Sequence, residues 1–96
     1  MMRCFFTPAA ESDLEEIGDY IAADSPARAL LFVQQLRKRC QELCGFPKAY
    51  PLRSDLAPHI RVMAFRHYLI CYSLHPDRVV IERIMQGSRD VQALFR

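Results

Sequence analysis

Arginines and histidines are the residues of this 96-residue chain that offer the most reactive chemistry. Arg61 and Arg83 lie in apolar, β-forming segments, and His67 directly precedes another one. Guanidinium groups bind phosphate, and a histidine with an ordinary pKa of about 6.5 transfers protons near neutral pH. We interpret His67 as a turn residue and keep an acid–base role for it as the alternative.

The cysteines offer a second kind of chemistry. Cys40 and Cys44 are four residues apart, and His59, His67 and His75 follow them. Two thiolates on one helical turn plus a histidine can bind Zn²⁺. Both cysteines, however, fall on or beside an apolar helical stripe, where a free cysteine behaves as a small hydrophobe. We therefore expect core thiols, and we predict neither a metal site nor a cofactor.

The net charge of +2 conceals an uneven distribution. Residues 1–27 hold six acids and one base, whereas residues 28–96 hold twelve bases and five acids. Residues 60–96 carry only +3, which is too little for a convincing DNA-binding surface. The basic set there has two open interpretations, a solvated rim or a docking surface for an acidic protein tail. Its members are Arg61, Arg66, Arg78, Arg83 and Arg89.

Length and hydropathy limit the class of protein. A chain of this size forms one domain, residues 1–96. Its longest apolar runs, 29–33 and 68–72, are far shorter than the ~20 residues that span a bilayer. The first residues also lack the apolar stretch of a signal peptide. We therefore expect a cytoplasmic protein with reduced thiols and no membrane partner.

Two helices should position the first half of the chain. An apolar strand over 2–7 leads to Thr7-Pro8, and Ser25-Pro26 follows later; both pairs are typical helix starts. Apolar residues recur at helical spacing up to about residue 21 and again up to Cys44, where Gly45 predicts a stop. The short connection predicts an antiparallel hairpin. We expect the acids of the first helix to form a solvated face without chemistry.

Strand-forming residues dominate the second half. After a proline-rich loop over 46–59, strands are predicted over 60–65, 67–74 and 79–86. The last of these should present Val79, Ile81, Arg83 and Met85 on one face, and Ser88 should begin a short final helix. The order is then strand, two helices, three strands and a helix. This predicts an α+β domain in which an N-terminal strand and a helical hairpin pack on an antiparallel sheet, with that strand at an edge or beside a distant partner.

Five segments in this order resemble the RelE/ParE toxin superfamily of bacterial type II toxin–antitoxin modules, and within it the ParE-like branch. They are FTPAAESDLEEIGDYIA, SPARA, the C-x-x-L-x-x-x-P stretch from Cys40 to Pro47, IRVMAFRHYLICYSL and VIERIMQGSRDVQALF. The resemblance implies the same fold and a toxin that an antitoxin holds inactive. It also implies one of two activities: ParE-like members inhibit DNA gyrase, and RelE-like members cut mRNA on the ribosome.

The C-terminal residues favour the gyrase inhibitor. Arg61 and Arg83 resemble phosphate-binding arginines of the nucleases, but no His, Tyr or Lys follows Arg83. Cleavage of RNA needs an acid–base group beside cations that hold the phosphate. We therefore predict an inhibitor that acts by protein binding and is not a catalyst. The alternative is the RelE-like endonuclease, with Arg61 and Arg83 as phosphate-binding residues and His67 as the acid–base group. A toxin that has lost its activity and serves only to regulate its operon is a third possibility.

Two sets of contact residues follow from the resemblance and from interface chemistry. The gyrase-binding candidates are Ser88, Arg89, Asp90, Leu94 and Phe95. The candidates for binding a ParD-like antitoxin are Leu30, Val33, Arg61, Arg66 and Arg83. At least one of Leu94 and Phe95 should instead pack on the sheet. Operator DNA is expected to be bound only indirectly, through the antitoxin.

Overall fold

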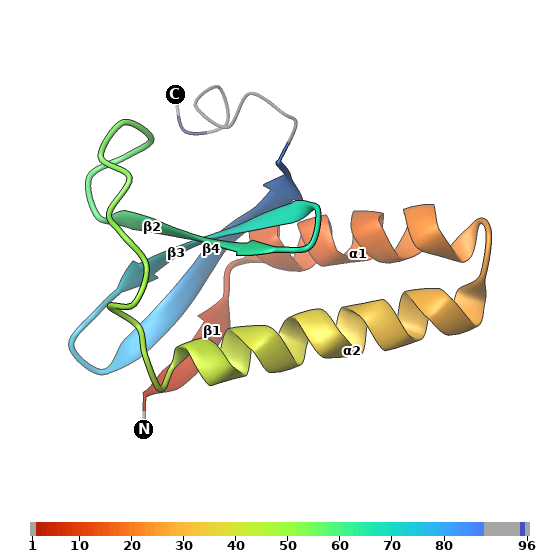
Figure 1. Cartoon of the computed structure of the whole chain (residues 1–96), viewed down its shortest axis with the longest axis horizontal. Helices are drawn as coiled ribbons and strands as arrows, with labels where there is room; N and C mark the ends of the chain where they lie inside the picture. Colours follow the sequence, from red (N-terminus) through yellow and green to blue (C-terminus); the bar gives the residue numbers. More distant parts are fainter. Residues whose placement is uncertain (1, 88–94, 96) are drawn as a thin grey trace.

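The computed structural model describes residues 2–87 and residue 95, and it consists of a helical hairpin packed on a four-stranded sheet (Figure 1). The elements in chain order are β1 (Arg3–Phe6), α1 (Pro8–Ala22), α2 (Pro26–Leu43), β2 (Ile60–Phe65), β3 (Tyr68–Leu74) and β4 (Arg78–Gln86). The predicted order of these six elements is confirmed. The final helix predicted after Ser88 lies outside the described residues.

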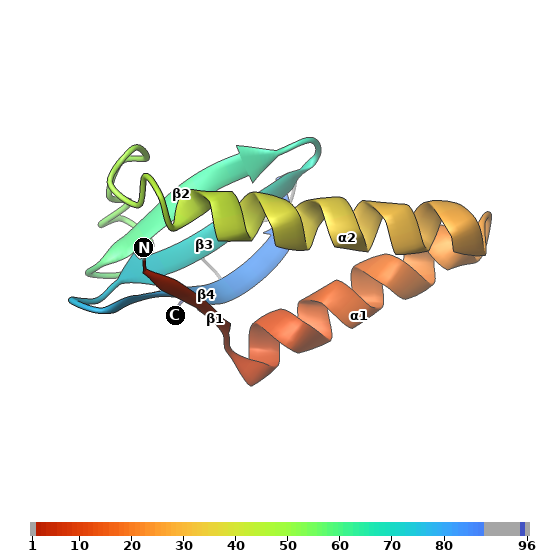
Figure 2. The ribbon, with the colours of Figure 1, turned by 90° about the horizontal axis from the view of Figure 1, so that it is seen from below.

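The sheet has the strand order β1-β4-β3-β2. The last three strands form the predicted antiparallel meander, and β1 lies at an edge, parallel to β4. The sheet is therefore mixed. A parallel pair needs a long connection, and β1 and β4 are connected through the helical hairpin and the other two strands. Figure 2 shows both helices against one face of this sheet, with the turn between them well beyond the strands.

Side-chain caps start both helices where the sequence predicts. The Thr7 hydroxyl accepts a hydrogen bond from the Ala10 N–H at 3.0 Å, and the Ser25 hydroxyl accepts one from Arg28 N–H at 3.2 Å. Each cap satisfies a backbone donor that has no partner within the helix, and the proline that follows has no N–H to satisfy. Helix α2 ends at Leu43, one residue before the predicted Cys44.

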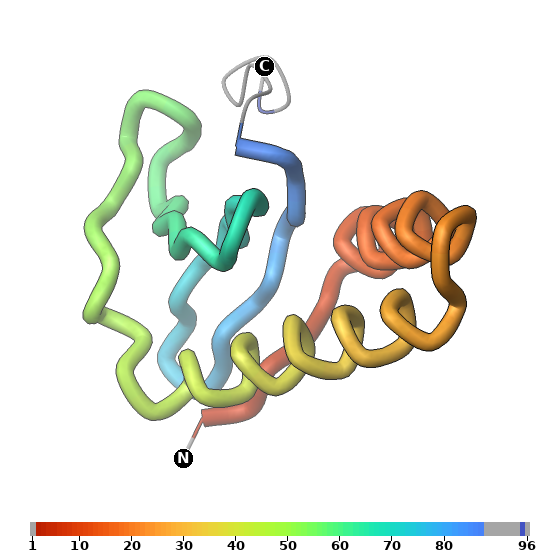
Figure 3. The backbone as a smooth tube through the Cα atoms, turned by 45° about the vertical axis from the view of Figure 1, so that its right-hand side comes forward, coloured from red at the N-terminus to blue at the C-terminus, as the bar shows by residue number. Residues whose placement is uncertain are grey.

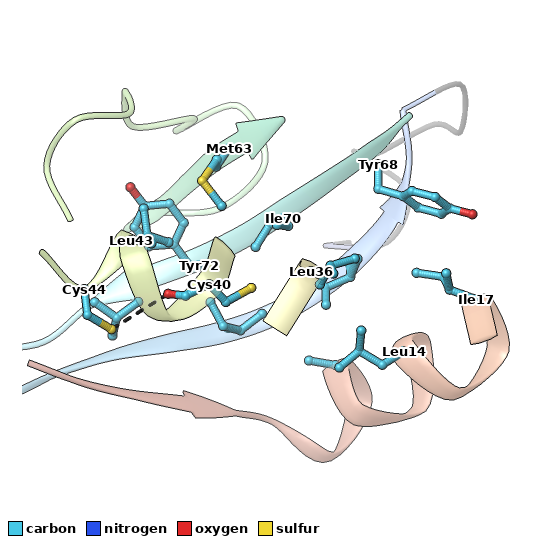
Figure 4. Close-up of a cluster of buried hydrophobic side chains, with 14 residues drawn as sticks. Leu14, Ile17, Leu36, Cys40, Leu43, Cys44, Met63, Tyr68, Ile70 and Tyr72 are labelled. Carbon is cyan, nitrogen blue, oxygen red and sulfur yellow. Dashed lines mark hydrogen bonds between the residues drawn. The ribbon is translucent and has the colours of Figure 1, made fainter. Parts of the chain in front are cut away.

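Two apolar clusters lie on the two faces of the sheet. The larger one joins the helices to the sheet through fully buried side chains such as Leu36, Ile70 and Tyr72 (Figure 4). The smaller one contains Leu56, Ile60, Cys71 and Met85, and we call the face that carries it the second face. The sheet therefore has an apolar layer on both sides.

One predicted strand face is wrong. Cys71 pairs with Arg83 but Tyr72 pairs with Ile81, so Glu82 is an extra residue, a β-bulge. A bulge shifts the alternation of side chains by one residue. Beyond the bulge Ile84 packs in the helix-side core, whereas Met85 lies on the second face. The predicted common face of Val79, Ile81, Arg83 and Met85 therefore ends at Ile81.

Within residues 2–87 and 95, no helix is long and apolar enough to cross a membrane.

The backbone trace in Figure 3 shows the loop over 46–59 running along the outer side of the sheet, away from the hairpin turn. The two ends of the hairpin thus differ: one is tied to this loop, and the other extends free of the sheet.

Candidate functional site

Arg83, a candidate in two of the predicted sites, is held by an acid of α1. Its Nε and Nη2 atoms donate to the two Asp13 carboxylate oxygens at 2.9 and 3.0 Å. The same carboxylate accepts the Ile84 N–H at 2.8 Å. This hydrogen bonding raises the pKa of Arg83 above its ordinary value. Arg83 is thus already bound to an acid within its own chain.

The position of Asp13 corrects the expectation that the acids of α1 are all solvated. Asp13 is 8% exposed, whereas Glu11, Glu15 and Asp19 are exposed as expected. The reason is local topology: β1 ends at Phe6, so beyond Ile81 the outer edge of β4 lacks a strand partner. The carboxylate satisfies an N–H there and matches the nearby guanidinium, which stabilises the buried charge.

Arg61 is also used within the chain. Its Nη1 atom donates to the Tyr50 carbonyl at 2.6 Å, and the Tyr72 hydroxyl donates to the Pro47 carbonyl at 2.7 Å. Arg39 donates to the Tyr50 hydroxyl at 2.9 Å. Three side chains from α2, β2 and β3 therefore fasten the start of the 46–59 loop. Arg61 acts as an anchor of this loop, a role that sequence reasoning missed.

His67 lies in the β2–β3 turn, away from both arginines. Arg61 stands at the other end of β2, four residues before Phe65, which corresponds to about 13 Å along the strand. Arg83 points to Asp13 on α1. The structure therefore does not bring Arg61, His67 and Arg83 together.

Arg66 and His67 instead line an open groove of about 550 Å³ at the end of the sheet. The other lining residues are Tyr20, Tyr68, Leu69, Gln86 and Gly87. Arg66 has a φ of 55°, and its guanidinium lies 5.6 Å from the Phe65 ring centroid. Its Nη2 donates to Gln35 Oε1 at 3.4 Å. With no acid paired to it among the described residues, Arg66 is an exposed cation beside the groove.

Exposed apolar side chains mark the half of the hairpin next to its turn. Leu30 is 63% exposed, Leu31 55% and Tyr20 73%. Val33 differs from these residues, because it is half-buried against the core and close to Gly18. Of the two apolar antitoxin candidates, Leu30 is thus a surface residue and Val33 is a packing residue.

Most of the gyrase-binding candidates, Ser88, Arg89, Asp90 and Leu94, lie outside the described residues. Phe95 is half-buried and packs against the cluster on the second face. This confirms the expectation that at least one of the last apolar residues packs on the sheet.

The predicted core thiols are confirmed. Cys40 and Cys44 are buried in the helix-side cluster (Figure 4), and all four cysteines are free thiols. Burial raises the pKa of Cys40 and of Cys4 to about 12, so these thiols stay protonated. Among residues 2–87 and 95, no three side chains of the types that bind metals are grouped to hold an ion.

Comparison with known proteins identifies a protein family that matches most of the chain. A family model described as ParE toxin of type II toxin-antitoxin system, parDE, matches residues 4–91. No curated protein sequence matches the chain.

Two solved structures resemble the fold. One is described as the chromosomal ParDE toxin–antitoxin system from P. aeruginosa; its chain is 24% identical with a TM-score of 0.77, and the match covers 90% of this chain and 96% of that one. The other is a conserved hypothetical protein, HP0894, from Helicobacter pylori, 13% identical with a TM-score of 0.52, covering 93% and 98% of the two chains. Both likenesses concern the fold.

Proposed function

Because the chain belongs to the ParE toxin family of type II toxin–antitoxin systems, we propose that it inhibits DNA gyrase by protein binding and that a ParD-like antitoxin neutralises it. Inhibition by binding needs an exposed surface and no proton transfer. The toxin would trap gyrase in the state in which its DNA is cleaved. Gyrase acts in the cytoplasm, so the proposal places the toxin there.

The observation that carries this proposal is the separation of the three nuclease candidates. Arg83 is bound to Asp13, Arg61 holds the Tyr50 carbonyl, and His67 lies at the far end of β2. A phosphate-cleaving centre needs its cations and its acid–base group within hydrogen-bonding reach of one substrate. Their dispersal favours action through a surface over RNA cleavage by these residues.

The antitoxin surface is proposed at the free half of the helical hairpin. Leu30 and Leu31 are large apolar side chains in water, and such exposed groups are typical of surfaces that a partner covers. An amphipathic helix of the antitoxin can cover them. Arg66 adds a cation that suits an acidic segment. Operator DNA would then be bound through the antitoxin.

The RelE-like endonuclease remains as a second candidate, supported by the groove at the end of the sheet. His67 and Arg66 line it together with Tyr20 and Tyr68. A histidine and an arginine around one groove could serve a phosphodiester substrate. This arrangement replaces the predicted set, because Arg61 and Arg83 do not reach it.

The decisive experiment compares purified toxin in two assays, each with and without the antitoxin encoded beside it. Loss of supercoiling with accumulation of cleaved gyrase–DNA complex, relieved by antitoxin, supports the proposal. Specific mRNA cleavage on ribosomes, with gyrase unaffected, would reject it. For the nuclease alternative, His67→Ala and Arg66→Ala should each abolish cleavage, and a variant that still cuts would exclude the groove.

A further inference from the structure

The second face of the sheet carries a groove whose lining residues are not among the candidates for gyrase or antitoxin contact. It has a volume of about 560 Å³, within the usual range for binding pockets. One wall comes from the end of the 46–59 loop and the other from the β3–β4 hairpin. Its apolar lining includes Pro58, Ile60, Leu74 and Pro76.

Three polar side chains of this groove form one hydrogen-bonded chain. The Ser73 hydroxyl donates to Glu82 Oε2 at 2.7 Å and lies 3.0 Å from His75 Nε2. A hydroxyl has a single proton, so in the second contact the His75 ring N–H is the donor. Among the described residues, no hydrogen bond uses the second Glu82 carboxylate oxygen, Oε1, or His75 Nδ1. The chain therefore presents acceptors to a ligand.

Two backbone irregularities adjoin the same groove. Glu82 is the bulged residue of β4, and a bulge commonly redirects a side chain beside a functional site. His59 has a φ of 97°, a conformation that costs free energy in a residue with a side chain. Such features persist where the surrounding structure holds them, and here both border a groove lined by His59, Ser73, His75 and Glu82.

The charge of Glu82 indicates the ligand. Among the residues that the structure describes, no arginine or lysine forms an ion pair with this half-buried carboxylate. A carboxylate removed from water is normally paired with a cation or fully hydrogen-bonded.

We propose that this groove binds a basic side chain, arginine or lysine, of a partner protein. The aliphatic stem would lie against Ile60, Leu74 and Pro76, and the charged head would donate to Glu82 and His75. The site lies on the face opposite the hairpin. It is separate from the proposed antitoxin surface at Leu30.

The test uses ¹⁵N-labelled full-length protein and two small probes, acetyl-arginine methylamide and its neutral citrulline analogue. The two probes have nearly the same shape and differ in charge. We expect the arginine probe to shift the amide resonances of Ser73, His75 and Glu82 in a saturable way. The citrulline probe should bind at least about fivefold more weakly.

Glu82→Gln provides the matched variant, because glutamine keeps an acceptor for the Ser73 hydroxyl but carries no charge. It should weaken the arginine probe by at least about fivefold and leave the citrulline probe unchanged. Equal binding of the two probes to the unaltered chain, shifts located elsewhere, or no saturable shift at millimolar concentration would each overturn the proposal. The probe comparison stands even if the variant fails to fold.

Discussion

At the scale of single residues, Asp13 has the most consequential position. One carboxylate serves the Arg83 guanidinium and the Ile84 backbone N–H, which joins α1 to β4 across seventy residues of sequence. Its buried charge is stabilised because both partners are present. The same contact occupies the Arg83 guanidinium, which is then not free to bind a phosphate group of a substrate.

Asp13→Ala should lower the free energy of unfolding by about 2–4 kcal/mol, since it leaves Arg83 and the Ile84 N–H without their acceptor. Arg83→Met should cost a similar amount, because it leaves the buried Asp13 carboxylate with the Ile84 N–H but without a cation. Urea unfolding measures both. The exposed pair Glu11–Arg37 is the control, and Glu11→Ala should cost under about 1 kcal/mol. Equal costs for Asp13→Ala and Glu11→Ala would contradict this account.

The buried thiols predict a loss of stability in alkali. Burial raises the pKa of Cys40 from 9.0 to about 12 and that of Cys71 to about 11. At a pH between 9.0 and about 11, the thiols of the unfolded chain lose their protons, whereas the buried thiols of the folded chain retain theirs. The unfolded state then binds fewer protons, so stability falls as pH rises above about 9.

Urea unfolding under reducing conditions, from about pH 8 to pH 10.5, measures this loss. Cys40→Ala should be less stable at every pH but should show a shallower decline, because one titrating group is gone. Stability that stays constant or increases over this range would show that the thiols are not held protonated by burial.

At the scale of elements, the short β1 determines how the helices meet the sheet. After β1 ends, Thr7 continues along the same edge: its N–H donates to the Ile81 carbonyl at 3.0 Å and its hydroxyl to the Glu82 carbonyl at 2.8 Å. The hydroxyl also caps α1. Thr7 therefore links the end of β1, the start of α1 and the bulged residue of β4.

Thr7→Ala should cost more stability than Ser25→Ala. Removal of an exposed cap such as Ser25 costs about 0.5–1 kcal/mol, whereas Thr7 also loses the bond to Glu82, for a total of about 1.5–2.5 kcal/mol. Thr7→Ser keeps the hydroxyl and should retain most of this stability. Thermal and urea unfolding of the three variants give the comparison, and a Thr7→Ala cost no larger than that of Ser25→Ala would refute it.

Local signals in the sequence predict these elements better than they predict the contacts between them. Thr7-Pro8 and Ser25-Pro26 mark both helix starts because a cap depends on residues three positions away. The bulge at Glu82 and the burial of Asp13 depend on the end of β1 and on an edge some seventy residues distant. For the same reason the sequence predicts Arg61 and Arg83 as site residues, although both anchor parts of their own chain in the structure.

At the scale of the whole molecule, the hairpin and the second face present different surfaces. The free half of the hairpin is apolar, with Leu30, Leu31 and Tyr20 exposed. The groove of the second face combines apolar walls with the carboxylate of Glu82. The separation of these surfaces by the sheet would let one partner cover the hairpin while another contacts the opposite side.

Leu30 provides the sharpest test of the proposed antitoxin surface. Because its side chain is 63% exposed, Leu30→Asp should change the stability of the free chain by no more than about 0.5 kcal/mol. If the antitoxin covers it, the variant must bury a charge at the interface, and affinity should fall at least about tenfold.

Titration calorimetry with the antitoxin measures this affinity. Gln41→Asp, an equal change of charge at an exposed position near the opposite end of α2, should bind as the unaltered chain does. Val33→Ala separates packing from contact: it should destabilise the free toxin, because Val33 packs against the core beside Gly18. An unchanged affinity of Leu30→Asp would place the antitoxin elsewhere, because an apolar surface that tolerates a buried carboxylate is not the one being covered.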